Sequence, residues 1–188
     1  MKNSKIIAIA LLSIFSFSSC NNDDPIAVNE EEVITTVTTT LKNGSETITL
    51  ISRDLDGNGP NKPQISVSGT LKVNTTYTGS VSFLNDLESP AEDITLEIQE
   101  EGNDHQIFFE TPSSLGDFTY TDLDENAKPI GLTFTMTTGA SATSGNIFVT
   151  LIHRPNKSAA GVSDGDKTNA GGGTDALAEY PVQVVVNN

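Results

Sequence analysis

The sequence predicts an all-β protein: a single antiparallel β-sandwich of the immunoglobulin-like type, with a small β-barrel as the alternative. Apolar and polar residues alternate in many short stretches, as where Ile65, Val67 and Leu71 alternate with serine and threonine. A period of two is typical of a strand with one buried and one solvated face. No stretch of ten or more residues shows helical periodicity, and a length of 188 residues suits one domain. The pattern therefore favours two packed antiparallel sheets, or one sheet closed on itself.

The same alternation defines each expected strand, and turn residues mark its ends. About nine strands are expected, at residues 33–41, 46–51, 65–71, 77–83, 94–98, 105–109, 130–136, 147–153 and 180–186. Glycine, asparagine, aspartate and proline lie between them, at residues 42–44, 56–60, 89–90, 101–104 and 125–129. The segment 155–178 is irregular and rich in glycine, aspartate, serine and alanine. We expect this segment to be a functional or mobile loop.

Composition and charge exclude several classes of protein. The chain has 25 acidic and 10 basic residues, a formal net charge of -15, so it repels phosphates and we expect no nucleic-acid partner. A single cysteine cannot form a disulfide within the chain. The sequence has no G-x-S-x-G nucleophile elbow, no H-E-x-x-H zinc motif and no glycine-rich phosphate loop before a helix. We therefore expect that the protein is not an enzyme.

The N-terminus has the form of a lipoprotein signal peptide. Lys2 and Lys5 precede an uncharged apolar stretch, residues 6–17. At about 1.5 Å per residue this stretch is much shorter than the ~30 Å hydrocarbon core of a membrane. Two serines then lead to Cys20, an arrangement that resembles the lipobox of bacterial lipoproteins. Acylation of Cys20 would anchor the chain to lipid of the outer membrane.

The chain is thus expected to consist of a signal peptide over residues 1–19, an acidic tether over residues 20–32 and a β-sandwich domain over residues 33–188. The tether carries Asp23 and Asp24 soon after the cysteine, and three consecutive glutamates at its end. An acidic patch in this place resembles the surface-export signal of Bacteroidetes lipoproteins. It implies a lipid-anchored protein displayed on the cell surface, with a periplasm-facing anchor as the alternative.

Five stretches of the domain together carry a family resemblance. They are residues 53–61 (RDLDGNGPN), 104–109 (DHQIFF), 129–132 (PIGL), 153–157 (HRPNK) and 171–175 (GGGTD). In this order and spacing they resemble small flavobacterial lipoproteins labelled "type 1 periplasmic binding fold superfamily", over most of the chain from about residue 33. The resemblance implies that this protein acts together with a TonB-dependent outer-membrane receptor. The label itself names a fold of two α/β lobes, for which this chain has neither the length nor the helices.

Residues 54–59 contain half of a calcium-binding motif. Asp54, Asp56 and Asn58, followed by glycine, match the first half of an EF-hand loop, in which alternate oxygens converge on calcium. The twelfth position, which requires a bidentate glutamate, is Ile65. Asparagine and aspartate beside glycine are also typical of an ordinary strand connection. Both a calcium-stabilised loop and a plain turn fit this stretch.

The two histidines are the other candidate metal ligands. By strand parity His105 shares a face with Ile107 and Phe109, and His153 shares one with Leu151. Such a histidine is either a packed core residue or a ligand. If the strand ends bring the pair together with an acid, the site would suit zinc or copper, and two imidazoles alone could ligate haem iron. The acids considered for this site are Asp104, Asp164, Asp166 and Asp175.

Two functions fit these features. The first is a tethered module that captures a metal ion, haem or a small solute and passes it to a TonB-dependent receptor. It depends on the histidines, the acidic loops and the family resemblance. The second is a structural or protein-interaction module of the cell envelope without a small ligand, which the ordinary composition also permits.

Overall fold

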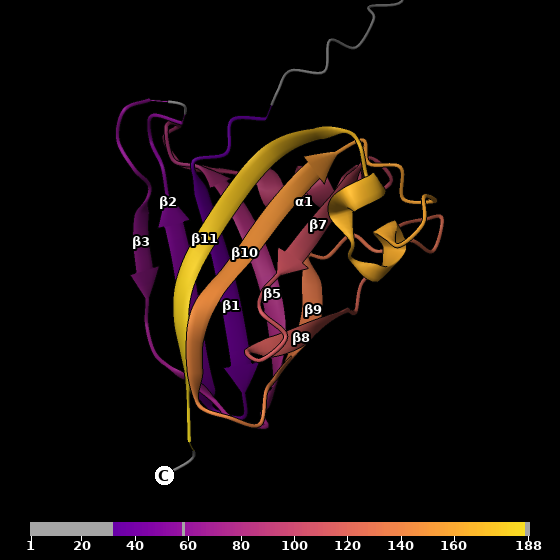
Figure 1. The fold of residues 1–188 in the computed structure, drawn as a ribbon. Coiled ribbons are helices and arrows are strands. Elements are labelled where there is room, and N and C mark those ends of the chain that lie inside the picture. Colours follow the sequence, from indigo (N-terminus) through magenta and orange to yellow (C-terminus); the bar gives the residue numbers. More distant parts are fainter. Residues whose placement is uncertain (1–31, 58, 187–188) are drawn as a thin grey trace, which may run out of the picture. The chain divides into compact units, whose positions relative to one another are not determined.

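The computed structural model describes residues 32–57 and 59–186, and this part of the chain is all-β, as predicted (Figure 1). Its strands are β1 Thr36–Asn43, β2 Glu46–Arg53, β3 Gln64–Val67, β4 Leu71–Lys72, β5 Thr76–Asn85, β6 Glu92–Asp93, β7 His105–Glu110, β8 Gly116–Tyr120, β9 Thr133–Thr138, β10 Thr143–His153 and β11 Gly173–Val185. The helical elements are α1 Ile94–Glu100 and two 3₁₀ turns, Val162–Asp164 and Lys167–Asn169. The predicted signal peptide, the lipidation site Cys20, Asn58 and the tether up to residue 31 lie outside the described residues.

The strands form two sheets that enclose a shared core. The larger sheet has the order β3-β2-β1-β5-β9-β8, with β6 paired to β5, and its pairs are antiparallel. The smaller sheet has the order β4-β11-β10-β7, and its short β4–β11 pairing is parallel. Figure 1 shows β10 and β11 crossing over β1 and β5. Inward-facing residues of both sheets form one apolar cluster, which includes Tyr77, Phe83, Phe134, Leu151 and Tyr180.

Residues 94–98, predicted as a strand, form a helix instead. The side chain of Asp93 caps α1 by accepting a hydrogen bond from the backbone N–H of Thr95 at 3.0 Å. Ile94 and Ile98, four residues apart, are both buried, as they are on one face of a helix. Short apolar runs fit either element, and here packing and the cap select the helix. No helix in the described part of the chain is long and apolar enough to cross a membrane.

The strands near residue 130 also differ from the prediction. The predicted strand 130–136 begins only at Thr133, in β9, because Ile130 contacts β7 instead: its carbonyl accepts a hydrogen bond from the N–H of Ile107 at 2.7 Å. β8 was not predicted at all. Its partner is β9, and its apolar alternation is limited to Phe118 and Tyr120.

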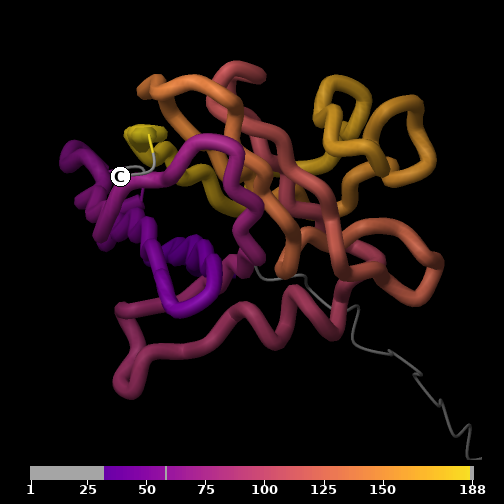
Figure 2. Tube along the Cα trace, turned by 90° about the horizontal axis from the view of Figure 1, so that it is seen from below, coloured from indigo at the N-terminus to yellow at the C-terminus, as the bar shows by residue number. Residues whose placement is uncertain are grey.

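The segment predicted as one long loop, 155–178, consists of two parts. Residues 155–172 form turns that pack on the outer face of the smaller sheet, over Phe108 and Ile152. Nε2 of the fully buried Gln106 donates a hydrogen bond to the Val162 carbonyl at 2.7 Å, which ties this loop to β7. Figure 2 shows the loop on the side of the domain away from β1 and β2. The rest of the predicted loop belongs to β11, so Asp175 is a strand residue.

Candidate metal site

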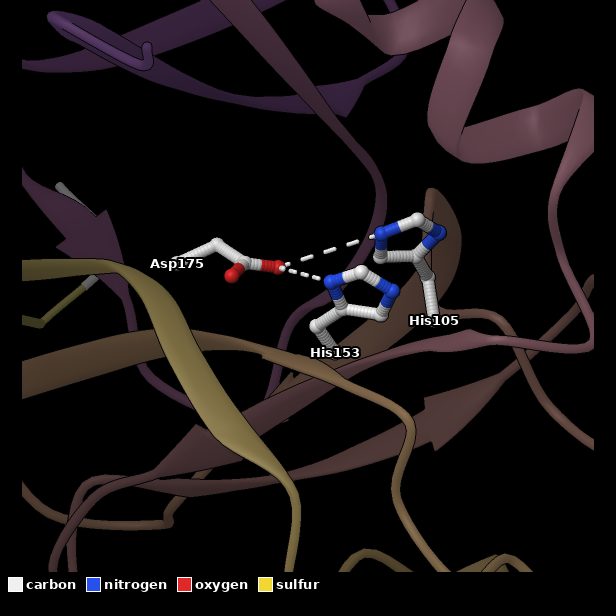
Figure 3. Close-up of side chains that lie close together, drawn as sticks. All are labelled: His105, His153 and Asp175. Atoms are coloured by element: carbon white, nitrogen blue, oxygen red, sulfur yellow. Dashed lines mark ion pairs between the residues drawn. The ribbon is translucent and has the colours of Figure 1, made fainter. Parts of the chain in front are cut away.

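The two histidines lie side by side at one end of the smaller sheet. His105 is the first residue of β7 and His153 is the last residue of β10, and the antiparallel register pairs them directly. Their rings stack with centroids 4.8 Å apart and an interplanar angle of 29° (Figure 3). Each histidine lies at the end of a row of core-facing residues on its strand, since Ile107 and Leu151 belong to the apolar cluster. The parity prediction is therefore confirmed, and strand pairing brings the histidines together.

Asp175 reaches the histidines through a β-bulge. The register of β10 and β11 shifts at Leu151 and Ile152, so that Asp175 is an extra residue on β11. A bulge re-aims a side chain, and such bulges are frequent next to functional sites. Oδ2 of Asp175 lies 3.8 Å from Nε2 of His105 and 3.9 Å from Nδ1 of His153. Figure 3 shows the carboxylate directed toward both rings. These three residues are called the histidine site below.

A backbone carbonyl sets the tautomer of His105. Nδ1 lies 3.2 Å from the carbonyl oxygen of Glu101, which can only accept, so Nδ1 carries the hydrogen. Nε2 then faces the carboxylates of Asp175 and Glu32. Metal-binding histidines are commonly oriented in this way, by a hydrogen bond from the second ring nitrogen. His105 is thus placed to offer Nε2 to a cation.

Glu32, which the sequence places in the tether, lies next to His105 and forms a second ligand-sized group with it and Glu101, apart from His153 and Asp175. Its Oε1 lies 3.3 Å from Nε2 of His105, and its side chain is 8% exposed. It belongs to residues 32–35, which lead into β1. The only signal in the sequence was the run of three glutamates, a pattern that usually indicates a solvated segment.

The site is largely buried. His105 is fully buried, and the side chains of His153 and Asp175 are 14% and 12% exposed. Burial acts to lower the pKa of His105, but the hydrogen bond and charge of Glu32, the Glu101 carbonyl and Asp175 together raise it above its usual value. Buried carboxylates require a compensating cation, either a proton on an imidazole or a metal ion.

The separations between donor atoms suit a four-coordinate transition-metal ion. With metal–ligand bonds of about 2.0–2.1 Å, the ligands of a tetrahedral ion lie roughly 3.3–3.4 Å apart. The separations between Asp175 and the two histidines, 3.8 and 3.9 Å, exceed that value by about 0.4–0.6 Å. Imidazole and carboxylate are ligands of zinc and copper, whereas calcium takes oxygen ligands. The stacked rings leave no room for a porphyrin between them, so the arrangement favours an ion over haem.

Asp175 also lines a groove that offers an approach to the site. The groove has a volume of about 250 Å³ and lies between the start of β1, the end of β2 and the start of β11. Asp54 lies on its wall together with Asp175. Two carboxylates in one groove raise the local concentration of cations, because like charges in a concave surface focus the field.

In the loop at residues 54–59 the carboxylates accept hydrogen bonds that stabilise a turn. Oδ1 of Asp54 accepts hydrogen bonds from the N–H groups of Asp56 and Gly57, at 3.2 and 3.1 Å. Oδ2 of Asp56 accepts from the backbone and side-chain amides of Asn61, which lower the pKa of Asp56. These are the bonds of an Asx-type turn, and among the described residues this loop supplies no group of three metal ligands. The calcium site, whose third ligand Asn58 is not described, stays a prediction.

The other acids considered for the site lie apart from it. Asp166 caps the second 3₁₀ turn by accepting a hydrogen bond from the N–H of Thr168 at 2.9 Å. Asp164 lines a different groove, beside Phe118. The backbone carbonyl of Asp104 accepts from the N–H of Arg154 at 2.6 Å. Within the described ranges, Asp175 is therefore the acid that forms a ligand-sized group with both histidines.

Comparisons with protein-family models, with curated proteins and with solved structures find no match for this chain. A functional assignment therefore depends on the geometry of the site and on the signals in the sequence.

Proposed function

We propose that the protein captures a transition-metal ion, zinc or copper, at the histidine site. The observation that carries this proposal is the β-bulge that directs Asp175 toward two stacked imidazoles. A histidine that merely packs in a core needs one partner for its N–H group. Here two ring nitrogens from different strands converge on the same carboxylate oxygen, at 3.8 and 3.9 Å. Convergence of imidazole and carboxylate on one point is the requirement for binding a metal ion.

The signals at the N-terminus support a place for this activity in the cell envelope. Acylation of Cys20 would hold the domain at the outer membrane, and the acidic tether favours the cell surface. The family resemblance suggests a TonB-dependent receptor as the protein that takes up the captured ion. The net charge of -15 would attract cations to the domain.

A second candidate function is a protein-interaction module, favoured by a groove beside α1. This groove has a volume of about 690 Å³ and contains neither histidine. Leu96 and Leu123 on its rim are 60% and 61% exposed, and Glu100 and Glu125 also line it. Exposed leucines flanked by charges are typical of a surface that a partner covers.

Metal titration of three histidine variants and one control variant separates these functions. The full-length chain, purified in detergent, is titrated calorimetrically with zinc, with copper and with haem. His105→Ala and His153→Ala should each remove most of the affinity for the metal, and the double variant should lose little more, because ligands of one ion act as a unit. Asp164→Asn serves as the control, since this acid lies outside the histidine site.

Each outcome assigns the histidines a role. Micromolar or tighter binding that both single variants lose supports capture. If the histidines only pack in the core, no metal or haem binds to the wild type, and the substitutions lower the melting temperature of the metal-free protein. That result would leave the interaction module as the better function.

A further inference from the structure

We infer that the groove beside α1 binds an extended segment of a partner protein in which an apolar residue is followed, two positions on, by lysine or arginine. The inference rests on the second candidate function, the interaction module, and gives it a partner of stated chemistry. It is independent of metal capture at the histidine site. The groove of about 690 Å³ is called the α1 groove below.

The α1 groove combines an apolar base with exposed leucines. Ile130 and Leu132 line it and are buried, so they form its base. Leu96 comes from α1 and Leu123 from the loop between β8 and β9, and both are mostly exposed. Apolar surface in water is unfavourable by about 25 cal/mol per Å², so an apolar side chain that covers both leucines gains binding energy.

Each wall of the groove carries a leucine and a glutamate at a similar spacing. Leu96 and Glu100 are four residues apart in α1, which places them on one face of the helix, about 6 Å apart along its axis. Leu123 and Glu125 are two residues apart in the loop, at most about 7 Å. Residues two positions apart in an extended peptide point to the same side with a spacing of about 6.6 Å. The spacing of the walls therefore matches that of an extended ligand.

A hydrogen bond places both glutamates toward the same end of the groove. Nδ2 of Asn126 donates to Oδ1 of Asn103 at 2.8 Å. Glu125 directly precedes Asn126, and Glu100 precedes Asn103 by three residues. The leucines come earlier in both segments and lie farther along the chain from this link. An apolar residue held between the leucines thus directs the side chain two positions on toward the glutamates.

The charges of the groove favour a cationic side chain at that end. Neither lysine, arginine nor histidine is among the described residues that line the groove. Asp124 pairs with Lys157, and both carboxylate oxygens of Asp122 accept backbone N–H groups. Glu100 and Glu125 form no ion pair within the described part of the chain. A guanidinium or ammonium group between them would be attracted by both.

Selection of a random peptide library tests the predicted pattern. Twelve-residue peptides displayed on phage are selected on the full-length chain in detergent. The wild type should enrich peptides with an apolar residue followed two positions on by lysine or arginine. The double variant Leu96→Ser, Leu123→Ser should lose this enrichment. The double variant Glu100→Lys, Glu125→Lys should select an acidic residue in place of the basic one, because it keeps the leucines and reverses the charge.

The chain offers a matched control on β11. Leu177 is 58% exposed and Glu179 follows it two positions on, but neither residue lines the α1 groove. The double variant Leu177→Ser, Glu179→Lys should therefore enrich the same peptides as the wild type. This control distinguishes the groove from any exposed leucine that lies beside a glutamate.

Fluorescence anisotropy of the most enriched peptide measures the two contributions. Leu96→Ser and Leu123→Ser should each weaken binding by about 10-fold or more, the range expected for burial of a leucine. Glu100→Gln and Glu125→Gln should each weaken it by about 2- to 5-fold at low salt, the range of an exposed ion pair. With a peptide whose basic residue is replaced by glutamine, the glutamate variants should bind like the wild type.

The outcomes separate this inference from the proposed function. Enrichment that the leucine double variant loses and the β11 control keeps supports the inference. Peptides selected equally by the wild type and the leucine double variant, or no enriched pattern, overturn it. Self-association of the wild type that the leucine double variant loses, measured by analytical ultracentrifugation, would assign the groove to a second copy and also overturn it. Metal titration of the histidine variants is a separate measurement, so failure of either proposal leaves the other intact.

Discussion

Lys157 connects the loop at residues 155–172 to the backbone that orients His105. Its ammonium donates to Oδ2 of Asp124 at 2.8 Å, to the Pro129 carbonyl at 2.9 Å and to the carbonyl of Gly102, which follows Glu101 in the chain. The side chains of Lys157 and Asp124 are 6% and 1% exposed. Burial raises the pKa of Asp124, but the Lys157 ammonium and backbone N–H groups lower it below its usual value.

Lys157→Met keeps the length of the side chain and removes the charge. The substitution leaves the Asp124 carboxylate uncompensated and two buried carbonyls without their donor. Removing one partner of a buried ion pair lowers the free energy of unfolding by about 3–5 kcal/mol. For a domain of this size each 1 kcal/mol lowers the melting temperature by about 2–4 °C, so the expected decrease is roughly 6–20 °C.

Thermal unfolding followed by circular dichroism measures this decrease, and urea unfolding measures the free energy. Lys167→Ala is the control, because Lys167 pairs with Glu110 on the surface, with side chains 37% and 44% exposed, and its loss should cost about 0.5 kcal/mol or less. Asp124→Asn in the Lys157→Met background removes the uncompensated charge and should restore at least about 1 kcal/mol. A Lys157→Met protein as stable as Lys167→Ala would refute the reasoning.

Three further predictions concern other parts of the molecule. The hydroxyl of the buried Tyr180 donates to the Val37 carbonyl at 2.8 Å, so Tyr180→Phe should cost about 1 kcal/mol in urea unfolding. Hydrogen bonds from Arg53 and Thr36 lower the pKa of Asp86, so its contribution to stability is complete above about pH 4 and is lost as the pH falls through the lowered pKa. The stability difference between wild type and Asp86→Asn should shrink over that range, and a constant difference would contradict the assignment. Millimolar calcium should raise the melting temperature if residues 54–59 bind it. An equal melting temperature with calcium and with chelator would show that residues 54–59 form a plain turn.

The site was only partly predictable from the sequence. Strand parity placed His105 and His153 on core-facing rows, because the period of two is a local property of the backbone. Nothing local showed that these residues, 48 positions apart, are register partners across β7 and β10. The bulge that presents Asp175 depends on how β10 and β11 pair over their whole length. Glu32 was assigned to the tether, because only the folded domain places the buried His105 beside it.

The sequence by itself determined the all-β class and most of the strands, because alternation and turn residues act over a few positions. It also supports the prediction of lipidation at Cys20, because a lipobox is a linear pattern. Tertiary structure decided between helix and strand at residues 94–98, where the 94/98 spacing and the Asp93 cap fit a helix packed on β5. It also decided which of many carboxylates meet the histidines. Long-range pairing and burial select these contacts, and neither is encoded in the local spacing of residues.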